Sequence, residues 1–552
     1  MKPFCTKALA ALVAVTLGLP PAALPKEHKI AKDKQIVHAL DRLTFGPRPG
    51  DVEAVTKLGL KKWIDQQLHP ERIEENPVLE AKLAPLESLR LSPEEAAAKF
   101  PLANAKTKRR DDADAKKPLN EILTPSEIGT LRRGTPEQKR ELIASFTPEK
   151  LTDLAASIPA GQRQQLIVAA PAGIRRQLVM ASAPQQLMAQ DLFEAKIYRA
   201  VYSNRQLEEL LSDFWFNHFN VFFDKGADRV LTAAYERDAI RPNVLGHFRD
   251  LLEATAKSPA MLFYLDNWQS VAPQSSARPR QQSRGLNENY ARELMELHTL
   301  GVDGGYTQKD IIEVARCFTG WTIKTPRLGG GFVFNPRVHD NGEKVVLGEK
   351  IPAGGGIEDG ERVLDILAHH PSTAKFISRK LAVRFVSDNP PASLIDKMAK
   401  TFTKTDGDLR AMMKTLIEAP EFWSDTAYRA KIKSPLEMIV SAVRALNGDV
   451  DWAMPLANQI AQLGQPLYRK IEPTGYSSAN AEWVNSAALL ARMNFAIALA
   501  QNKVPGVKVD ASRFDANAVL QDASAQTRAA VEKAAPEQVT GLVLGSPEFQ
   551  RR

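Results

Sequence analysis

Apolar residues recur three and four positions apart along most of this chain, which is the pattern of amphipathic helices. Residues 36–70 predict two such helices, joined by a turn that contains Pro49 and Gly50. The same pattern continues through 185–320 and resumes from residue 356 onward. Because strand patterns are rare, the sequence predicts a mainly α protein built around a multi-helix domain.

One stretch, residues 331–348, alternates with a period near two instead. Asn341 and Gly342 lie at its centre, and Asn-Gly is a favoured pair for the two central residues of a hairpin turn. The sequence therefore predicts one small β-hairpin in this stretch, with its turn at Asn341 and Gly342.

A proline returns every 11 to 13 residues within 124–190, at Pro125, Pro136, Pro148, Pro159, Pro171 and Pro184. Several of these units begin Thr-Pro-Glu, which places a capping hydroxyl before a proline in the first helical turn. Each unit is predicted to be one short helix. Because such helices cannot bury a face alone, we expect this array to stack on itself or on the main domain.

The length of 552 residues allows two or three domains, or one domain with insertions. The predicted order is a signal peptide at 1–23, an N-terminal helical segment at 24–103, a charged linker at 104–118, the proline-punctuated short-helix array as an insertion at 119–190, a main helical domain at 191–500 that carries the hairpin at 331–348, and a helical tail at 501–552. The linker is a basic run followed at once by acidic residues, which is typical of a solvated segment.

The first residues have the three parts of a secretory signal. Lys2 and Lys7 precede an apolar run at 8–19, and small residues follow near Ala22. That run is too short for a comfortable membrane span, and no later stretch reaches about 18 uninterrupted apolar residues. We expect an exported protein, periplasmic or secreted, with no transmembrane helix in the mature chain.

Charge and cysteine content narrow the classes further. The formal net charge is +8, and the basic clusters are scattered rather than arranged in a stripe. No nucleic-acid-reading motif accompanies them, so no nucleic-acid partner is expected. Cleavage of the signal would remove Cys5 and leave Cys317 as the last cysteine, so packing rather than a disulfide must stabilise the fold.

The segment NENYARELMELHTLG is the first candidate for chemistry. Glu288, Arg292 and Glu296 follow one another at steps of four, which predicts a ladder of stabilising ion pairs on a helix surface. Glu293 and His298 lie off this ladder. They remain candidates for binding a ligand.

His218 is the second candidate, and it lies between Asn217 and Asn220 in the aromatic segment DFWFNHFNVFF. A buried polar group without a partner costs on the order of 1 to 3 kcal/mol, so these side chains must either tie helices together or bind something. Both alternatives stay open from the sequence.

His339 and Asp340, just before the expected hairpin turn, are the third candidate. A turn aspartate often bonds its own backbone, whereas a hairpin tip can also place side chains over a cleft. If His218, Glu293 and His339 converge, they could hold a divalent metal, since metal sites draw ligands from separate segments. The metal hypothesis depends on that convergence.

Familiar catalytic motifs are missing from the sequence. It contains no HExxH zinc motif, no GxSxG nucleophile motif and no GxxxxGK[ST] phosphate loop. Whether the protein is an enzyme is therefore left open.

Several longer stretches carry a family resemblance, among them FWFNHFNVF, NENYARELMELHTLGVDGGYTQKDIIEVARCFTGWT, HDNGEKVVLG, LGQPLYRKIEPTGY and RMNFAIAL. With these stretches the chain resembles the bacterial domain-of-unknown-function family numbered eighteen hundred, over roughly residues 36–500. The resemblance implies an exported, mostly helical protein. It supplies no catalytic residue to transfer.

Two functions follow as hypotheses. The first is a binding or scaffold protein of the cell envelope, in which the short-helix array and charged helix faces contact an envelope protein or polymer. The alternative is a metal-dependent or metal-independent hydrolase that acts on an envelope polymer.

Overall fold

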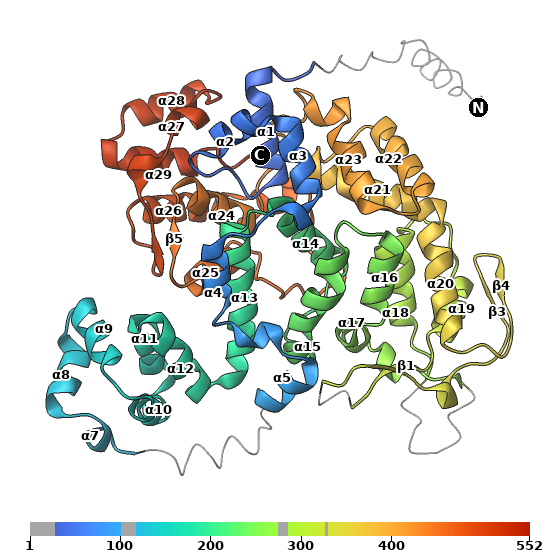
Figure 1. Cartoon of the computed structure of the whole chain (residues 1–552), viewed down its shortest axis with the longest axis horizontal. Coiled ribbons are helices and arrows are strands. Elements are labelled where there is room, and N and C mark those ends of the chain that lie inside the picture. Colours follow the sequence, from blue (N-terminus) through green and yellow to red (C-terminus); the bar gives the residue numbers. More distant parts are fainter. Residues whose placement is uncertain (1–27, 101–116, 274–284, 326–328) are drawn as a thin grey trace, which may run out of the picture.

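The computed structural model of the chain describes residues 28–100, 117–273, 285–325 and 329–552. Helices dominate these residues, so the predicted mainly α class is confirmed (Figure 1). The expected signal peptide and all but the last two residues of the expected linker lie outside the described residues.

The described residues of the N-terminal segment form five α-helices, α1 (Lys32–Leu43), α2 (Asp51–Leu58), α3 (Leu60–Leu68), α4 (Pro77–Leu83) and α5 (Pro93–Lys99). The turn predicted at Pro49 and Gly50 separates α1 from α2, and Gly50 takes a φ of 90° there. Residues 36–70 hold three helices rather than two, because Gly59, with a φ of 92°, divides α2 from α3.

The short-helix array is confirmed as a run of separate helices, α7 (Leu119–Ile122), α8 (Pro125–Arg133), α9 (Pro136–Ala144), α10 (Pro148–Ser157), α11 (Ala160–Ala169) and α12 (Ala172–Ser182). The side chains of Thr124, Thr135 and Thr147 each accept a hydrogen bond from the backbone amide three residues on. The array forms a separate lobe at the lower left of Figure 1.

Helix α13 (Pro184–Tyr202) joins this array to the main body, because it begins at the last proline of the repeat and ends deep in the core. The expected boundary at residue 190 thus falls inside a continuous helix. Arg176 of α12 pairs with Asp191 of α13, and the Arg175 guanidinium lies 4.2 Å from the ring centre of Trp452. These contacts fix the array to the rest of the protein.

The main body continues with α14 (Gln206–His218), α15 (Asp228–Ala234), α16 (Phe248–Ala256), α17 (Pro259–Tyr264), α18 (Glu288–Glu293), α19 (Gln308–Cys317), α20 (Ile357–His369), α21 (Pro371–Phe385), α22 (Ala392–Lys404), α23 (Leu409–Ile417), α24 (Pro435–Ala445), α25 (Met454–Gln462) and α26 (Ser486–Ala500). Two segments widen into π-helices, η3 (Tyr235–Ile240) after α15 and η8 (Leu294–Thr299) after α18. Such segments often occur at functional sites.

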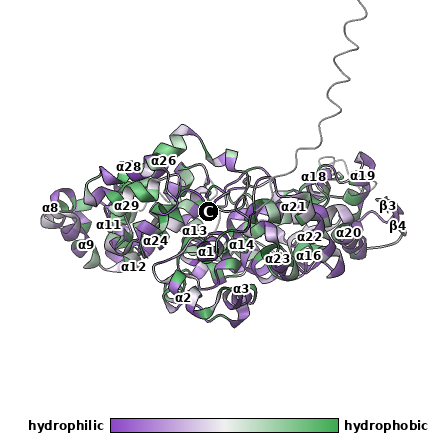
Figure 2. Cartoon of the chain, turned by 90° about the horizontal axis from the view of Figure 1, so that it is seen from above, coloured by the Kyte–Doolittle hydropathy of each residue, from purple (hydrophilic) through white to green (hydrophobic). Residues whose placement is uncertain are grey.

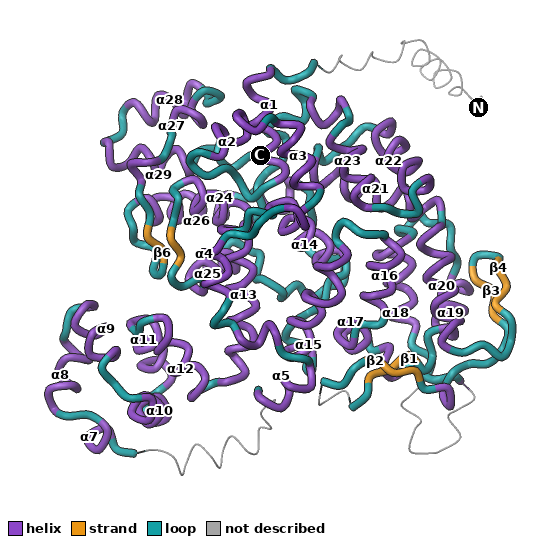
Figure 3. Tube along the Cα trace, in the orientation of Figure 1, coloured by secondary structure: helices purple, strands orange, loops and turns teal. Residues whose placement is uncertain are grey.

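Strands are confined to three two-stranded antiparallel sheets among the described residues, and all three lie at the periphery (Figure 3). They pair β1 (Trp321–Ile323) with β2 (Phe332–Phe334), β3 (Lys344–Val346) with β4 (Glu349–Ile351), and β5 (Asp449–Val450) with β6 (Val507–Lys508).

The predicted position of the hairpin turn was wrong. Residues 331–348 contain β2 and β3, which belong to different hairpins, and the turn between β3 and β4 is formed by Leu347 and Gly348. Both turn residues have positive φ, 51° and 84°, as a tight two-residue hairpin requires. Gly342 instead donates its amide to Asp340 Oδ1 at 2.9 Å, so the Asn-Gly pair serves a local side-chain contact.

The last residues return to the core. Helices α27 (Ala516–Leu520) and α28 (Ala525–Glu532) lead to α29 (Pro536–Gly545), which packs against α26. A Cβ atom at Gly545 would lie 2.3 Å from the Met493 sulfur, so α29 approaches α26 closely there. Seen from above, most outer helices carry both hydrophilic and hydrophobic residues (Figure 2). Among the described residues, none of the helices has the length and apolar character to span a membrane.

Candidate functional site

The helices of the array curve around a groove of about 1230 Å³. Its floor is apolar and buried, and it is formed by Leu123, Ile143, Leu154 and Leu166. Val168 of α11 lies at the groove and is 42% exposed. Among the described residues of the array, Val168 is the one large apolar side chain that is exposed, and it lies at this groove.

The rim of the groove is mostly basic. Arg132, Lys139 and Arg140 line it together with a single acid, Glu137. Asn120, Gln162, Gln164 and Gln165 add uncharged polar groups to the lining. An apolar floor with a positive rim is suited to a partner segment that is apolar on one face and acidic on the other.

The size of the groove fits a short helix. A helix is about 10 Å across and rises about 5.4 Å per turn, so roughly three turns would fill this volume. Binding of an amphipathic helix in a groove between helices is a common mode of peptide recognition.

A second hollow, smaller and polar, lies between α13, α14, α24 and the segment 465–478, and it has a volume of about 60 Å³. The Lys196 ammonium in this pocket pairs with Asp213 Oδ1 at 3.0 Å and lies 4.7 Å from the ring centre of Tyr468. Burial lowers the pKa of Lys196, but the carboxylates of Asp213 and Glu236 together outweigh it, so the pKa is raised. The lysine is therefore positively charged in the pocket.

Another charged group, centred on Glu437, forms the opposite wall. Its Oε1 accepts a hydrogen bond from Arg384 at 2.5 Å and forms an ion pair with Arg552 at 3.1 Å. Glu437 also closes a capping box with Ser434 at the start of α24. The two arginines and the cap hold this carboxylate in one position.

Asn217 and Asn220, both predicted as ligand-binding candidates, line this polar pocket. Their amides serve the neighbouring segment: Asn220 Nδ2 donates to the carbonyl oxygens of Lys470 and Glu472, each at 2.9 Å. Asn217 holds Tyr476 in the same way. The two asparagines therefore shape the pocket by fixing its wall.

His218 contacts another element instead. Its Nε2 donates to the carbonyl oxygen of His298 at 3.0 Å, and the ring centres are 6.1 Å apart. His218 Nδ1 and His298 Nε2 have no hydrogen-bond partner among the described residues. Burial, and secondarily the Lys380 charge, lowers the pKa of both rings, to about 3 for His298. Both are neutral imidazoles inside the core.

Glu293 ends α18 and is half-buried, and burial followed by repulsion from Glu296 raises its pKa. The predicted ladder forms only in part. Arg292 pairs with Glu288 at 3.4 Å, whereas Glu296 accepts from the Tyr306 hydroxyl at 3.2 Å. The π-helix η8 begins directly after Glu293 and widens the turn, so Glu296 does not stay aligned with Arg292.

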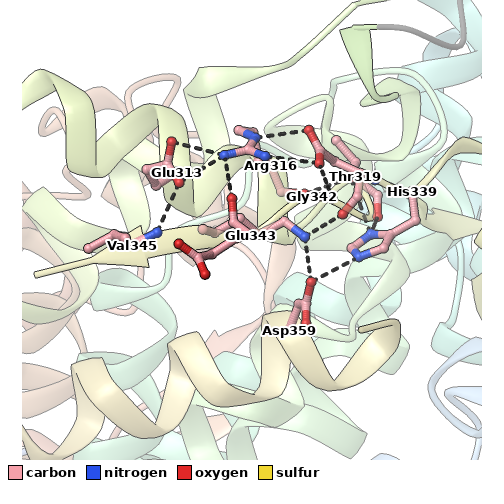
Figure 4. Close-up of polar contacts among 10 residues, drawn as sticks. Glu313, Arg316, Thr319, His339, Gly342, Glu343, Val345 and Asp359 are labelled. Carbon is pink, nitrogen blue, oxygen red and sulfur yellow. Dashed lines mark hydrogen bonds and ion pairs between the residues drawn. The ribbon is translucent and has the colours of Figure 1, made fainter. Parts of the chain in front are cut away.

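His339 lies in a buried polar cluster between α19 and α20 (Figure 4). Its Nδ1 is 2.7 Å from the Thr319 carbonyl oxygen, and its Nε2 is 3.2 Å from Asp359 Oδ2. Lys344 Nζ, fully buried, donates to the same Asp359 oxygen at 2.5 Å. The cluster ties β3 to α20.

Asp340 anchors the neighbouring segment to α19. Arg316 donates two hydrogen bonds, of 2.9 and 3.0 Å, to the Asp340 carboxylate. Arg316 also pairs with Glu313 (Figure 4). Burial raises the pKa of Asp340, but the hydrogen bonds from Arg316 and Gly342 outweigh it, so the pKa is lowered. All these groups have partners within the protein, which is typical of a structural cluster.

The metal hypothesis required three segments to converge. Within the described parts of the chain, no group of three or more His, Cys, Asp or Glu side chains could hold a metal ion. His218 thus lies with His298, and His339 lies with Asp359. The structure does not bring His218, Glu293 and His339 into one ligand set.

Sequence reasoning missed the charged residues of the polar pocket, such as Lys196, Asp213 and Glu437. The sequence did contain one indication of these charged residues. Asp213 interrupts the apolar run LLSDFWF, and Lys196 interrupts LFEAKIYRAVY, and a charge in such a run needs a buried partner.

These features define a mainly α protein that combines a grooved short-helix lobe with a polar pocket in its main body. The chain belongs to the family described as protein of unknown function (DUF1800), whose model matches residues 38–551. The predicted resemblance is confirmed and extends through the C-terminal helices. No curated protein and no solved structure matches the chain.

Proposed function

We propose that the protein is an exported binding protein of the cell envelope, and that its array holds an acidic, amphipathic helix of an envelope protein. The observation that carries this proposal is the groove of about 1230 Å³ with its apolar floor and basic rim. The signal-like sequence before residue 24 supports the expected location.

A protein helix suits the groove better than a polymer chain. Ile128, Leu131 and Val168 line the groove and keep part of their apolar surface exposed, so they gain from its burial by a partner, at about 25 cal/mol per Å². A polysaccharide has little such surface to bury. The basic rim then selects among apolar helices for those that carry acids beside the apolar face.

The alternative hydrolase function is not supported by a comparable observation. Its metal-dependent form needed His218, Glu293 and His339 in one place, and they do not form a ligand set among the described residues. Binding is therefore the function that the geometry favours.

The test is site-specific photo-crosslinking in the cells that make the protein. A photoreactive residue at Val168, inside the groove, should give an adduct with one envelope protein, whereas the same residue at Val302, which is 68% exposed elsewhere, should not. The cross-linked peptide should form an amphipathic helix with an acidic face. Equal adducts at both positions, or a peptide without acids, would contradict the proposal.

A matched pair of charge reversals tests the rim. Arg132 and Arg133 both end α8, but of the two only Arg132 lines the groove. With a synthetic peptide of the cross-linked segment, Arg132→Glu should weaken binding about tenfold in fluorescence anisotropy, and Arg133→Glu should change it little. Equal losses would show that the groove is not the docking site.

A further inference from the structure

The polar pocket of the main body has an uneven charge balance. Glu437 accepts a hydrogen bond from Arg384 and forms an ion pair with Arg552, so one side-chain carboxylate serves two guanidinium groups. All three side chains line the pocket.

Two further ion pairs lie at the pocket. Lys196 pairs with Asp213 at 3.0 Å, and Lys431 pairs with Asp388. The charged side chains that line the pocket are thus mostly cations, namely Lys196, Arg384, Lys431 and Arg552 beside the carboxylates of Asp213 and Glu437. A lining with more cations than carboxylates suits an anionic ligand.

The Lys196 ammonium also has hydrogen-bond donors that Asp213 does not use. An ammonium group has three N–H donors, and Lys196 uses one of them on Asp213, its one hydrogen-bonding acceptor within the described parts of the chain. The remaining donors can meet a ligand oxygen. Arginine and lysine together form the usual setting for a carboxylate.

The walls and the size limit what can enter. The volume of about 60 Å³ is several times the roughly 10 to 15 Å³ that one water needs. Apolar side chains face the same space, namely Phe214, Phe216, Ile432, Leu467 and Trp483. A carboxylate with a short hydrocarbon part fits this combination.

We propose that the polar pocket binds a small organic monoanion through its carboxylate group, next to Lys196 and the arginines that share Glu437. The pocket lies in the main body and not in the array. The inference is therefore independent of the proposed function.

The test compares propionate with propionamide, its uncharged counterpart of nearly equal shape, on the full chain. Isothermal titration and the fluorescence of Trp483, which lines the pocket, report binding; a Trp483→Phe variant assigns the signal. Propionate should bind saturably and propionamide at least tenfold more weakly. Equal binding of the two, or tighter binding of inorganic phosphate than of propionate, would overturn the proposal.

Three variants with unchanged circular dichroism locate the site. Lys196→Gln should weaken propionate binding at least tenfold, and Asp213→Asn should strengthen it several-fold, because one removes a cation and the other a carboxylate. Lys82 is the matched control, since it also pairs with an acid at 3.0 Å and lies over tyrosine rings, but outside the pocket. If Lys82→Gln weakens binding as much as Lys196→Gln, or Asp213→Asn weakens it, the pocket is not the site.

Discussion

Asn217 and Tyr476 exchange two hydrogen bonds across 259 residues of sequence: Asn217 Nδ2 donates to the Tyr476 carbonyl oxygen at 2.8 Å, and the Tyr476 amide donates to Asn217 Oδ1 at 2.6 Å. A Cβ atom at Gly475 would come within 2.1 Å of the Asn217 carbonyl oxygen, so the two segments touch. One end of α14 thereby fixes the segment that closes the polar pocket.

Replacing this asparagine should loosen the pocket wall. Asn217→Ala removes both hydrogen bonds and leaves two backbone groups unpaired, so we expect the free energy of unfolding to fall by about 1–3 kcal/mol. Urea unfolding gives this value, and hydrogen exchange should accelerate at the amides of residues 465–478. Asn494, which is exposed on α26, provides the control, and its alanine variant should leave both measurements unchanged. Equally fast hydrogen exchange in the original protein and in both variants would show that Asn217 does not hold this segment.

Buried histidines should make the protein sensitive to acid. The pKa of His298 is lowered from 6.5 to about 3 by burial first and Lys380 second, and that of His38 also to about 3, by burial first and Arg42 second. Below pH 6.5 these histidines bind protons in the unfolded chain, whereas they stay neutral in the folded protein. The free energy of unfolding therefore falls as the pH drops from about 6.5 toward 3. Each such histidine contributes up to about 1.4 kcal/mol per pH unit.

The pH dependence of the unfolding free energy shows how much His298 contributes to this sensitivity to acid. His298→Gln should reduce the dependence of the urea unfolding free energy on pH by about one proton between pH 4 and 6, whatever its effect on stability at pH 8. A slope identical to that of the original protein would show that His298 ionises freely in the folded state.

Much of the fold could be predicted because its signals are local. A threonine before Pro136 supplies a cap and the proline supplies a fixed φ, so each array helix begins where the sequence indicates. The failed hairpin turn shows the limit. Asn341 and Gly342 suit a turn, but Arg316 from another helix holds Asp340 beside them, and this tertiary contact places the turn elsewhere.

The sites were harder to predict because their parts come from distant segments. Asn217 and Asn220 were recognised as polar residues that need partners, yet their partners lie about 250 residues later. Likewise, nothing near Glu437 in the sequence indicates that Arg384 and Arg552 share it. A charged residue within an apolar run indicates that it has a buried partner, but it does not indicate which residue that partner is.

Asp228 should oppose folding at high pH. Its carboxylate is fully buried, neither oxygen has a hydrogen-bond partner among the described residues, and burial raises its pKa well above 3.8. The folded protein therefore holds a proton that the unfolded chain releases, so the stability from this group is complete below pH 3.8 and is lost as the pH rises through the folded pKa.

An asparagine at this position cannot ionise. Asp228→Asn should raise the urea midpoint at pH 8, and the gain should shrink toward pH 4. The exposed Asp303 serves as control, and Asp303→Asn should shift the midpoint little at either pH. A gain of equal size at both pH values would mean that ionisation of Asp228 is not its cause.

The pair of Lys344 and Asp359 should be costly to break from one side. Lys344 Nζ lies 2.5 Å from Asp359 Oδ2, and both side chains are buried. Lys344→Met leaves the carboxylate buried with His339 as its remaining side-chain partner, which should cost about 3–5 kcal/mol in urea unfolding. Lys350 of the same hairpin is exposed and pairs loosely with Glu343 at 3.5 Å, so Lys350→Met should cost less than about 1 kcal/mol.

A double-mutant cycle separates this pair from ordinary packing loss. When Asp359→Asn is added to Lys344→Met, no unpaired charge remains, so the double variant should be less destabilised than the sum of the two single variants by at least about 1 kcal/mol. Strictly additive losses would show that Lys344 stabilises the hairpin through its hydrocarbon chain. The cycle therefore decides whether the His339 cluster holds β3 to α20 by charge or by packing.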